Sequence, residues 1–185
     1  MINRRELIFT GTVGLFAAAS SRRASAAPPA PNDPVAIVTA IYIRAAKGKG
    51  AGGGAFVIES KPAKAKYLSK SLVELWAKAD AHTPKGDVGP VDFDPVTNSQ
   101  EPDVKSFKVV LEKQEAEKAV IAVTITGRNA ARRKAADQTV RYDFVRDTTD
   151  WRIDDIKGAS DGEIKGASDG EPWSIRNMLT ESLKN

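Results

Sequence analysis

Apolar and polar residues alternate along several segments in the second half of the chain. Apolar side chains recur at every second position in 107–111, 121–125 and 140–144, and the pattern begins again at Trp151 and Ile153. A period of two is typical of a strand with one buried face. The segments 114–117 and 146–149 are short and polar, as hairpin connections are. The sequence therefore predicts a four-stranded antiparallel meander.

The alternation is interrupted in the last of these strands. Trp151 and Ile153 fall on one face, whereas Ile156 falls on the opposite parity. Because a shift of one residue moves a side chain to the other face of a sheet, we expect a β-bulge or the strand's end at Asp154–Asp155.

Three segments have the apolar spacing of helices. The first is predicted to begin near Asn32–Pro34 and to end at Gly48, the second to cover 62–82, and the third 172–183 with Pro172 in its first turn. Helices are expected to cover the apolar face of the sheet. The predicted fold is therefore α+β, a curved four-stranded antiparallel meander covered by two N-terminal helices and one C-terminal helix.

Residues 1–26 are predicted to be an export signal peptide. Arg4 and Arg5, followed after one residue by two apolar ones, resemble a twin-arginine signal, and an ordinary secretory signal is the alternative. The small residues at 24 and 26 predict cleavage before Ala27, and the apolar run is too short to span a membrane. The mature protein would have a Pro-rich spacer at 27–32 and a single domain at 33–185. It would be periplasmic or secreted, without a stable membrane anchor.

The charge balance argues against nucleic acid as a partner. The whole chain has 28 Lys and Arg against 24 Asp and Glu, a formal charge of +4, and the predicted signal contributes +3 of it. The mature chain is therefore left near +1, too little for a general affinity for polyanions. The connection 127–134 has four cations without an aromatic neighbour, which favours a solvated hairpin tip over a base-stacking surface. An acidic partner or a lipid headgroup is the alternative for this tip.

Several catalytic and cofactor sites are excluded by residue type. His82 is the only histidine, so sites that need two imidazoles are not available, and without cysteine there is no disulfide. The run 48–54 matches G-x-G-x-x-G, but it follows a predicted helix instead of a strand, which is the wrong context for a dinucleotide. We therefore expect a mobile loop there, and no metal or cofactor.

The loop 86–101 contains the most distinctive polar residues. Asp92 and Asp94 would share a face in an extended chain, with Asn98 and Gln100 close behind. Such a pair can share a proton for acid–base chemistry, or can bind a hard cation. An EF-hand is excluded because Thr97 stands where that loop requires glycine. The third interpretation is an Asx turn before Pro95.

An octapeptide occurs twice in tandem, at 156–163 and 164–171. Two copies of eight residues are too few and too short for a solenoid. One copy is expected to be the connector from strand to helix and the other an insertion, which a surface loop tolerates. Either Ile156 or Ile164 could end the last strand.

Three segments resemble a known family. They are Leu72-Val73-Glu74-Leu75-Trp76, Val91-Asp92-Phe93-Asp94-Pro95 with Asn98 and Gln100, and Trp151-Arg152-Ile153-Asp154-Asp155-Ile156. On these residues the chain from about Asp33 is similar to a bacterial exported family, domain of unknown function 3828, in the nuclear-transport-factor-like superfamily. The resemblance implies a cone-shaped α+β domain with a pocket at its open end. The doubled octapeptide departs from the family pattern.

The resemblance implies a cell-envelope protein without an assigned reaction. The first hypothesis is a non-catalytic ligand-binding or accessory domain, and the alternatives are a small-molecule enzyme that uses Asp92 or Asp94 and an inhibitor or partner of another envelope protein. The protein would be a monomer or a homodimer. The candidate ligand-binding residues are Trp76, Asp92, Asp94, Asn98, Gln100, Tyr142 and Trp151.

Overall fold

The computed structural model describes residues 32–47, 53–128, 138–160 and 170–184. The predicted signal peptide, most of the spacer, most of the glycine-rich run and the centre of the doubled octapeptide lie outside these residues. No helix in the described part of the chain is both long and apolar enough to cross a bilayer.

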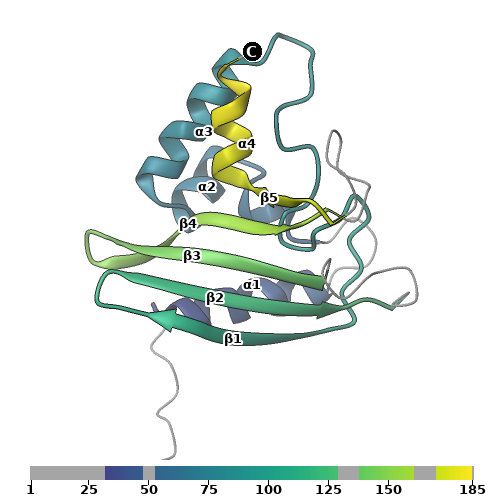
Figure 1. Cartoon of the computed structure of the whole chain (residues 1–185), viewed down its shortest axis with the longest axis vertical. Helices are drawn as coiled ribbons and strands as arrows, with labels where there is room; N and C mark the ends of the chain where they lie inside the picture. Colours follow the sequence, from purple (N-terminus) through teal and green to yellow (C-terminus); the bar gives the residue numbers. More distant parts are fainter. Residues whose placement is uncertain (1–31, 48–52, 129–137, 161–169, 185) are drawn as a thin grey trace, which may run out of the picture.

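The described residues form an α+β fold around one antiparallel sheet (Figure 1). The strands follow one another in the order of the sequence, as a meander does. They are β1 (Ser106–Gln114), β2 (Lys118–Thr126), β3 (Thr139–Asp147), β4 (Asp150–Ala159) and β5 (Pro172–Ser174). The prediction of four strands was therefore one strand short.

The fifth strand replaces what was expected to be the start of the C-terminal helix. Pro172 opens β5, and the helix α4 (Ile175–Ser182) begins after Ser174, whose hydroxyl accepts a hydrogen bond from the Asn177 amide at 3.2 Å. Proline suits the first turn of a helix, but it suits the start of an edge strand equally well. The short strand pairs with the end of β4, and this long-range contact decides between the two.

The predicted bulge in the last strand is confirmed. Asp143 of β3 pairs with Asp155, and the next residue, Phe144, pairs with Ile153, so Asp154 has no partner across the ladder. The extra residue returns Ile156 to the buried face, where it pairs with Tyr142. The bulge therefore explains the break in the alternation.

The helices before the sheet are α1 (Pro34–Lys47), the 3₁₀ turn η1 (Ala55–Val57), α2 (Lys61–Tyr67) and α3 (Lys70–His82). The single helix predicted for 62–82 is interrupted at Leu68 and Ser69. The Ser69 amide donates to the Ile153 carbonyl at 2.8 Å, and the Ser69 hydroxyl accepts from the Leu72 amide at 3.1 Å as the cap of α3. The break therefore exchanges helical hydrogen bonds for a contact with β4.

The core lies between one face of the sheet and the helices. Helix α1 packs against β1 and β2, and α3 and α4 lie side by side near β4 (Figure 1). Alternate residues of β2 to β4 are almost fully buried in one apolar cluster with residues of these helices. Two tyrosines from opposite sides of this core touch edge to face, Tyr42 of α1 and Tyr142 of β3, with ring centroids 6.2 Å apart.

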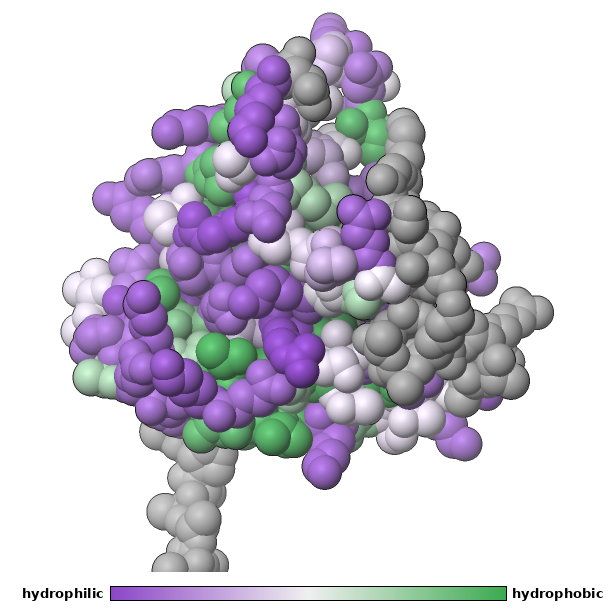
Figure 2. Space-filling view, in the orientation of Figure 1, coloured by the Kyte–Doolittle hydropathy of each residue, from purple (hydrophilic) through white to green (hydrophobic). Residues whose placement is uncertain are grey.

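The opposite face of the sheet is polar. Ion pairs cross it between Arg141 and Glu112, at 3.1 Å, and between Lys157 and Asp143. Hydrophilic side chains cover much of the surface in Figure 2, and apolar ones show near the β1 edge. Val110 of β1 is 39% exposed.

The first copy of the octapeptide supplies the end of β4. Ile156 occupies the buried strand position, so the alternative that Ile164 ends the strand is not what the structure shows. The Ser160 amide donates to the Glu171 carbonyl at 2.8 Å, and the Gly170 amide donates to the Ser160 carbonyl at 2.7 Å. The end of the second copy therefore leads into β5.

Candidate functional site

The loop between α3 and β1 folds back on itself at the Asp-Phe-Asp-Pro motif. The main chains of Asp94 and Ser99 exchange two hydrogen bonds, of 3.0 and 3.3 Å. Asn98 closes this turn with a φ of +52°, a conformation that asparagine tolerates better than most residues. The turn is buried from residue 93 to residue 99.

The Asp94 carboxylate holds this turn together. One of its oxygens accepts from the Val96 amide at 2.9 Å, which makes an Asx turn. The other accepts from the Gly54 amide at 2.6 Å and from the Thr97 hydroxyl at 2.8 Å. With three donors on a carboxylate that is 7% exposed, Asp94 acts as a structural anchor.

The end of the glycine-rich run packs directly on this turn. A Cβ atom on Gly54 would lie 2.0 Å from the Cβ of Val96, and one on Gly53 would lie 2.4 Å from the Asp94 carboxylate. Only glycine permits the backbone to approach these side chains so closely. The two described glycines thus have a packing role that the motif search did not reveal. The mobile loop expected for the run falls on 48–52, which lie outside the described residues.

An open cavity of about 860 Å³ lies beside the turn, between η1, α2, α3 and the loop. Its volume is in the range of small-molecule sites. The described apolar residues that line it are Ala55, Ile58, Trp76, Val91, Phe93 and Pro102. The described polar residues are Glu59, Lys64, Asp92, Asp94, Gln100 and Glu101. The cavity therefore combines an apolar wall with an acidic border.

Lys64 connects two sides of this cavity. Its ammonium lies 4.4 Å from the centre of the Trp76 ring, a cation–π contact, and 3.2 Å from the Asp80 carboxylate. Lys64 belongs to α2, whereas Trp76 and Asp80 belong to α3, one turn apart. The break between these two helices is what allows Lys64 to reach across to the Trp76 ring.

Four of the seven residues predicted for the site meet at this cavity. Trp76, Asp92, Asp94 and Gln100 line it, although Trp76 is only 5% exposed. No sequence pattern indicated that Glu59 and Lys64 contribute, because Lys64 lies on the lysine-rich helix face that is expected to be solvated and Glu59 is a single acidic residue before that helix.

The other three predicted residues lie elsewhere and have packing roles. The buried Asn98 amide accepts from the indole N–H of Trp173 at 2.9 Å and donates to a main-chain carbonyl of β4 at 2.8 Å. Burial raises the pKa of Tyr142, whose hydroxyl donates to that of Tyr42 at 3.1 Å. Trp151 is buried with the Arg146 guanidinium 4.6 Å above its ring.

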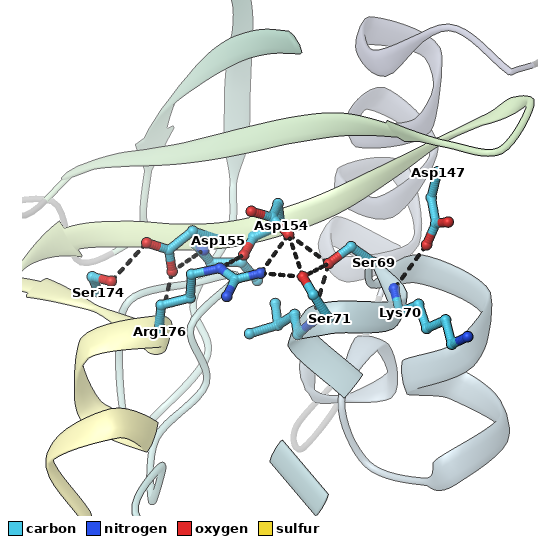
Figure 3. Close-up of polar contacts among 10 residues, drawn as sticks. Ser69, Lys70, Ser71, Asp147, Asp154, Asp155, Ser174 and Arg176 are labelled. Carbon is cyan, nitrogen blue, oxygen red and sulfur yellow. Dashed lines mark hydrogen bonds and ion pairs between the residues drawn. The ribbon is translucent and has the colours of Figure 1, made fainter. Parts of the chain in front are cut away.

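A second polar cluster joins the bulge to the starts of α3 and α4 (Figure 3). Asp154 accepts from the Ser69 hydroxyl at 2.5 Å, from the Ser71 hydroxyl at 3.1 Å and from the Arg176 guanidinium. Burial alone would raise the pKa of Asp154, but the hydrogen bonds from Ser69 and Arg176 and the Arg176 charge outweigh it, so the pKa is lowered.

Asp155 completes this cluster on the side of β5. Its carboxylate accepts from the Ser174 hydroxyl at 2.6 Å and from the amides of Ile156 and Arg176 at 2.9 and 3.0 Å. Burial raises the pKa of Asp155, and the hydrogen bond from Ser174 opposes this only in part. The cluster is therefore a clamp between strand and helices, with its donors and acceptors satisfied by one another.

In the part of the chain that is described, no group of three or more His, Asp or Glu side chains is placed to hold a metal ion. Comparison of the chain with protein-family models, curated proteins and solved structures finds no match in any of the three. What the protein does must therefore be inferred from its own residues.

Proposed function

We propose that the chain is a non-catalytic domain that binds a small molecule in the cavity beside Trp76 and the Asp-Phe-Asp-Pro turn. One observation carries this proposal. A cavity of about 860 Å³ has a wall of six apolar residues and a border of polar side chains, the usual composition of a small-molecule site. The turn that forms one side of it is fixed by the three hydrogen bonds of Asp94.

The chemistry of the lining supports binding over catalysis. Asp94 is occupied by main-chain and hydroxyl donors, which leaves Asp92 as the acid or base of the enzyme hypothesis. Among the described lining residues there is no hydroxyl, thiol or imidazole that could act as a nucleophile or relay a proton to Asp92. A non-catalytic site needs none of these groups.

The hypothesis of an inhibitor or protein partner requires an exposed apolar patch beside the same turn. Among the described residues of this loop, the strongly exposed large apolar side chain is Val88, at 75%. A single exposed valine is normal on a protein surface and does not make a patch. A small-molecule ligand is therefore the better proposal.

The cellular setting is part of the same proposal. The Arg4-Arg5 signal pattern supports export, which would place the domain in the periplasm or outside the cell. The resemblance to domain of unknown function 3828 supports the same setting. Both rest on sequence patterns.

A thermal-shift screen of the full chain against a panel of small metabolites tests the binding proposal. A ligand at about one hundred times its dissociation constant adds roughly 2.7 kcal/mol to the stability, an easily measured rise in melting temperature. Ala55→Phe, which places a large ring at an exposed position of the lining, should abolish the shift. Ala81→Phe makes the same change at an exposed position of α3 outside the described lining and should leave the shift intact.

Either of two results would overturn the proposal. One is a screen without any shift on a chain that melts cooperatively. The other is a shift that survives in Ala55→Phe, because the ligand would then bind elsewhere.

A further inference from the structure

We infer that the cavity takes an organic cation, a small molecule with an aromatic or other apolar body and an ammonium group, an inference that rests on the proposed function. Two observations support this inference. One is the excess of acidic residues in the lining, and the other is the cation–π contact that the Trp76 ring makes with Lys64.

The charge of the lining is unbalanced. Four acidic residues line the cavity against one basic residue, Lys64. Within the described residues, the carboxylates of Glu59, Asp92 and Glu101 form no ion pair, and the partner of Lys64 is Asp80, which is not among the lining residues. Carboxylates beside a low-dielectric wall attract a positive ligand and repel a negative one.

The Trp76 ring already makes a cation–π contact with an ammonium group of the chain itself. The Lys64 Nζ lies over its face, and the side chain of Lys64 is only 13% exposed in that position. The wall of the cavity is thus shaped for a cation on an aromatic face, the arrangement by which proteins recognise quaternary ammonium groups. In the structure, the Lys64 ammonium occupies this position over the Trp76 ring.

Lys64 is therefore expected to compete with the ligand. Its second contact, with Asp80, is a surface ion pair whose acceptor is 51% exposed, so it holds Lys64 in place only weakly. A ligand ammonium that displaces Lys64 gains the Trp76 face and the unpaired carboxylates together. Replacing Lys64 with a neutral side chain of similar length should consequently tighten binding, although it removes a polar residue from the site.

Isothermal titration calorimetry of the full chain with three probes of similar size tests this. The probes are benzyltrimethylammonium, benzyl alcohol and phenylacetate. We expect the ammonium to bind tightest, by roughly tenfold over benzyl alcohol, and to weaken as sodium chloride rises from about 20 to about 500 mM. Lys64→Met should tighten the ammonium by roughly three- to tenfold, and Asp92→Asn should weaken it by a similar factor. Glu181→Gln, on α4 outside the described lining, removes the same charge and should change nothing.

Failure of the ligand class can be distinguished from failure of the proposed function. Equal or tighter binding of benzyl alcohol or phenylacetate, or weaker binding of benzyltrimethylammonium to Lys64→Met, overturns the ligand class and leaves the cavity as a binding site. If none of the three probes binds, the ligand class is also overturned, and the proposed function is then decided by the metabolite screen with Ala55→Phe.

Discussion

The anchoring role of Asp94 gives the sharpest test of the site's architecture. Asparagine has the shape of aspartate, but it replaces one acceptor oxygen with a donor N–H₂ group. In Asp94→Asn, the side-chain N–H₂ group points toward the Gly54 main-chain N–H in one orientation and toward the Val96 main-chain N–H in the other. In either orientation one buried main-chain N–H therefore loses its acceptor. An unsatisfied buried donor costs about 1–3 kcal/mol, and the facing N–H groups also repel each other.

We therefore expect Asp94→Asn to lower the free energy of unfolding by about 2–3 kcal/mol, and Asp94→Ala, which leaves both the Gly54 and the Val96 amide without this acceptor, by roughly 3–5 kcal/mol. Urea denaturation followed by tryptophan fluorescence measures both. Asp92→Asn is the matched control, because Asp92 is half-buried in the same loop and has no hydrogen bond or ion pair within the described residues. Its effect should stay within about 0.5 kcal/mol. Equal midpoints for the Asp94→Asn and Asp92→Asn variants would refute the role assigned to Asp94.

Two further predictions concern the packing and the clamp. Gly54→Ala should destabilise the chain by about 1–3 kcal/mol in urea denaturation, because its Cβ would overlap Val96; Gly89→Ala, whose Cβ meets no atom within 4 Å, should not. The pKa of Asp154 lies below its ordinary value of 3.8, so the stability it contributes is complete above that pH and is lost as the pH falls through the lowered pKa. Melting temperatures measured against pH should therefore show a steeper acid loss in the natural chain than in Asp154→Asn, and parallel curves would contradict the assignment.

The alternation of apolar residues was sufficient to predict most of the sheet. Because the side chains of a strand point to opposite faces in turn, burying Ile121 and Val123 determines which face of β2 is buried. The same rule located the bulge, since Ile156 can join the buried face only if the ladder skips a residue. These features depend on the order of neighbouring residues, which can be read directly from the sequence.

The break between α2 and α3 and the strand β5 were decided by tertiary contacts. The local pattern around Ser69 suits a continuous helix. The Ser69 amide, however, donates to the carbonyl of Ile153, which lies 84 residues further along the chain. Pro172 suits a helix start and a strand start alike, and its pairing with Ala159 selects the strand. Local propensity is a weak preference that such contacts override.

The sequence by itself marked Trp76, Asp92, Asp94 and Gln100 as candidates, but only the fold turned them into one cavity. The Gly54 amide meets the Asp94 carboxylate across 40 residues of chain, and the helix break places Lys64 over Trp76. Neither contact leaves a local pattern, because each depends on how distant segments close around the core. The polar character of the site could thus be predicted from residue types. The shape of the cavity and the position of the Lys64 ammonium over the Trp76 ring were determined by tertiary packing.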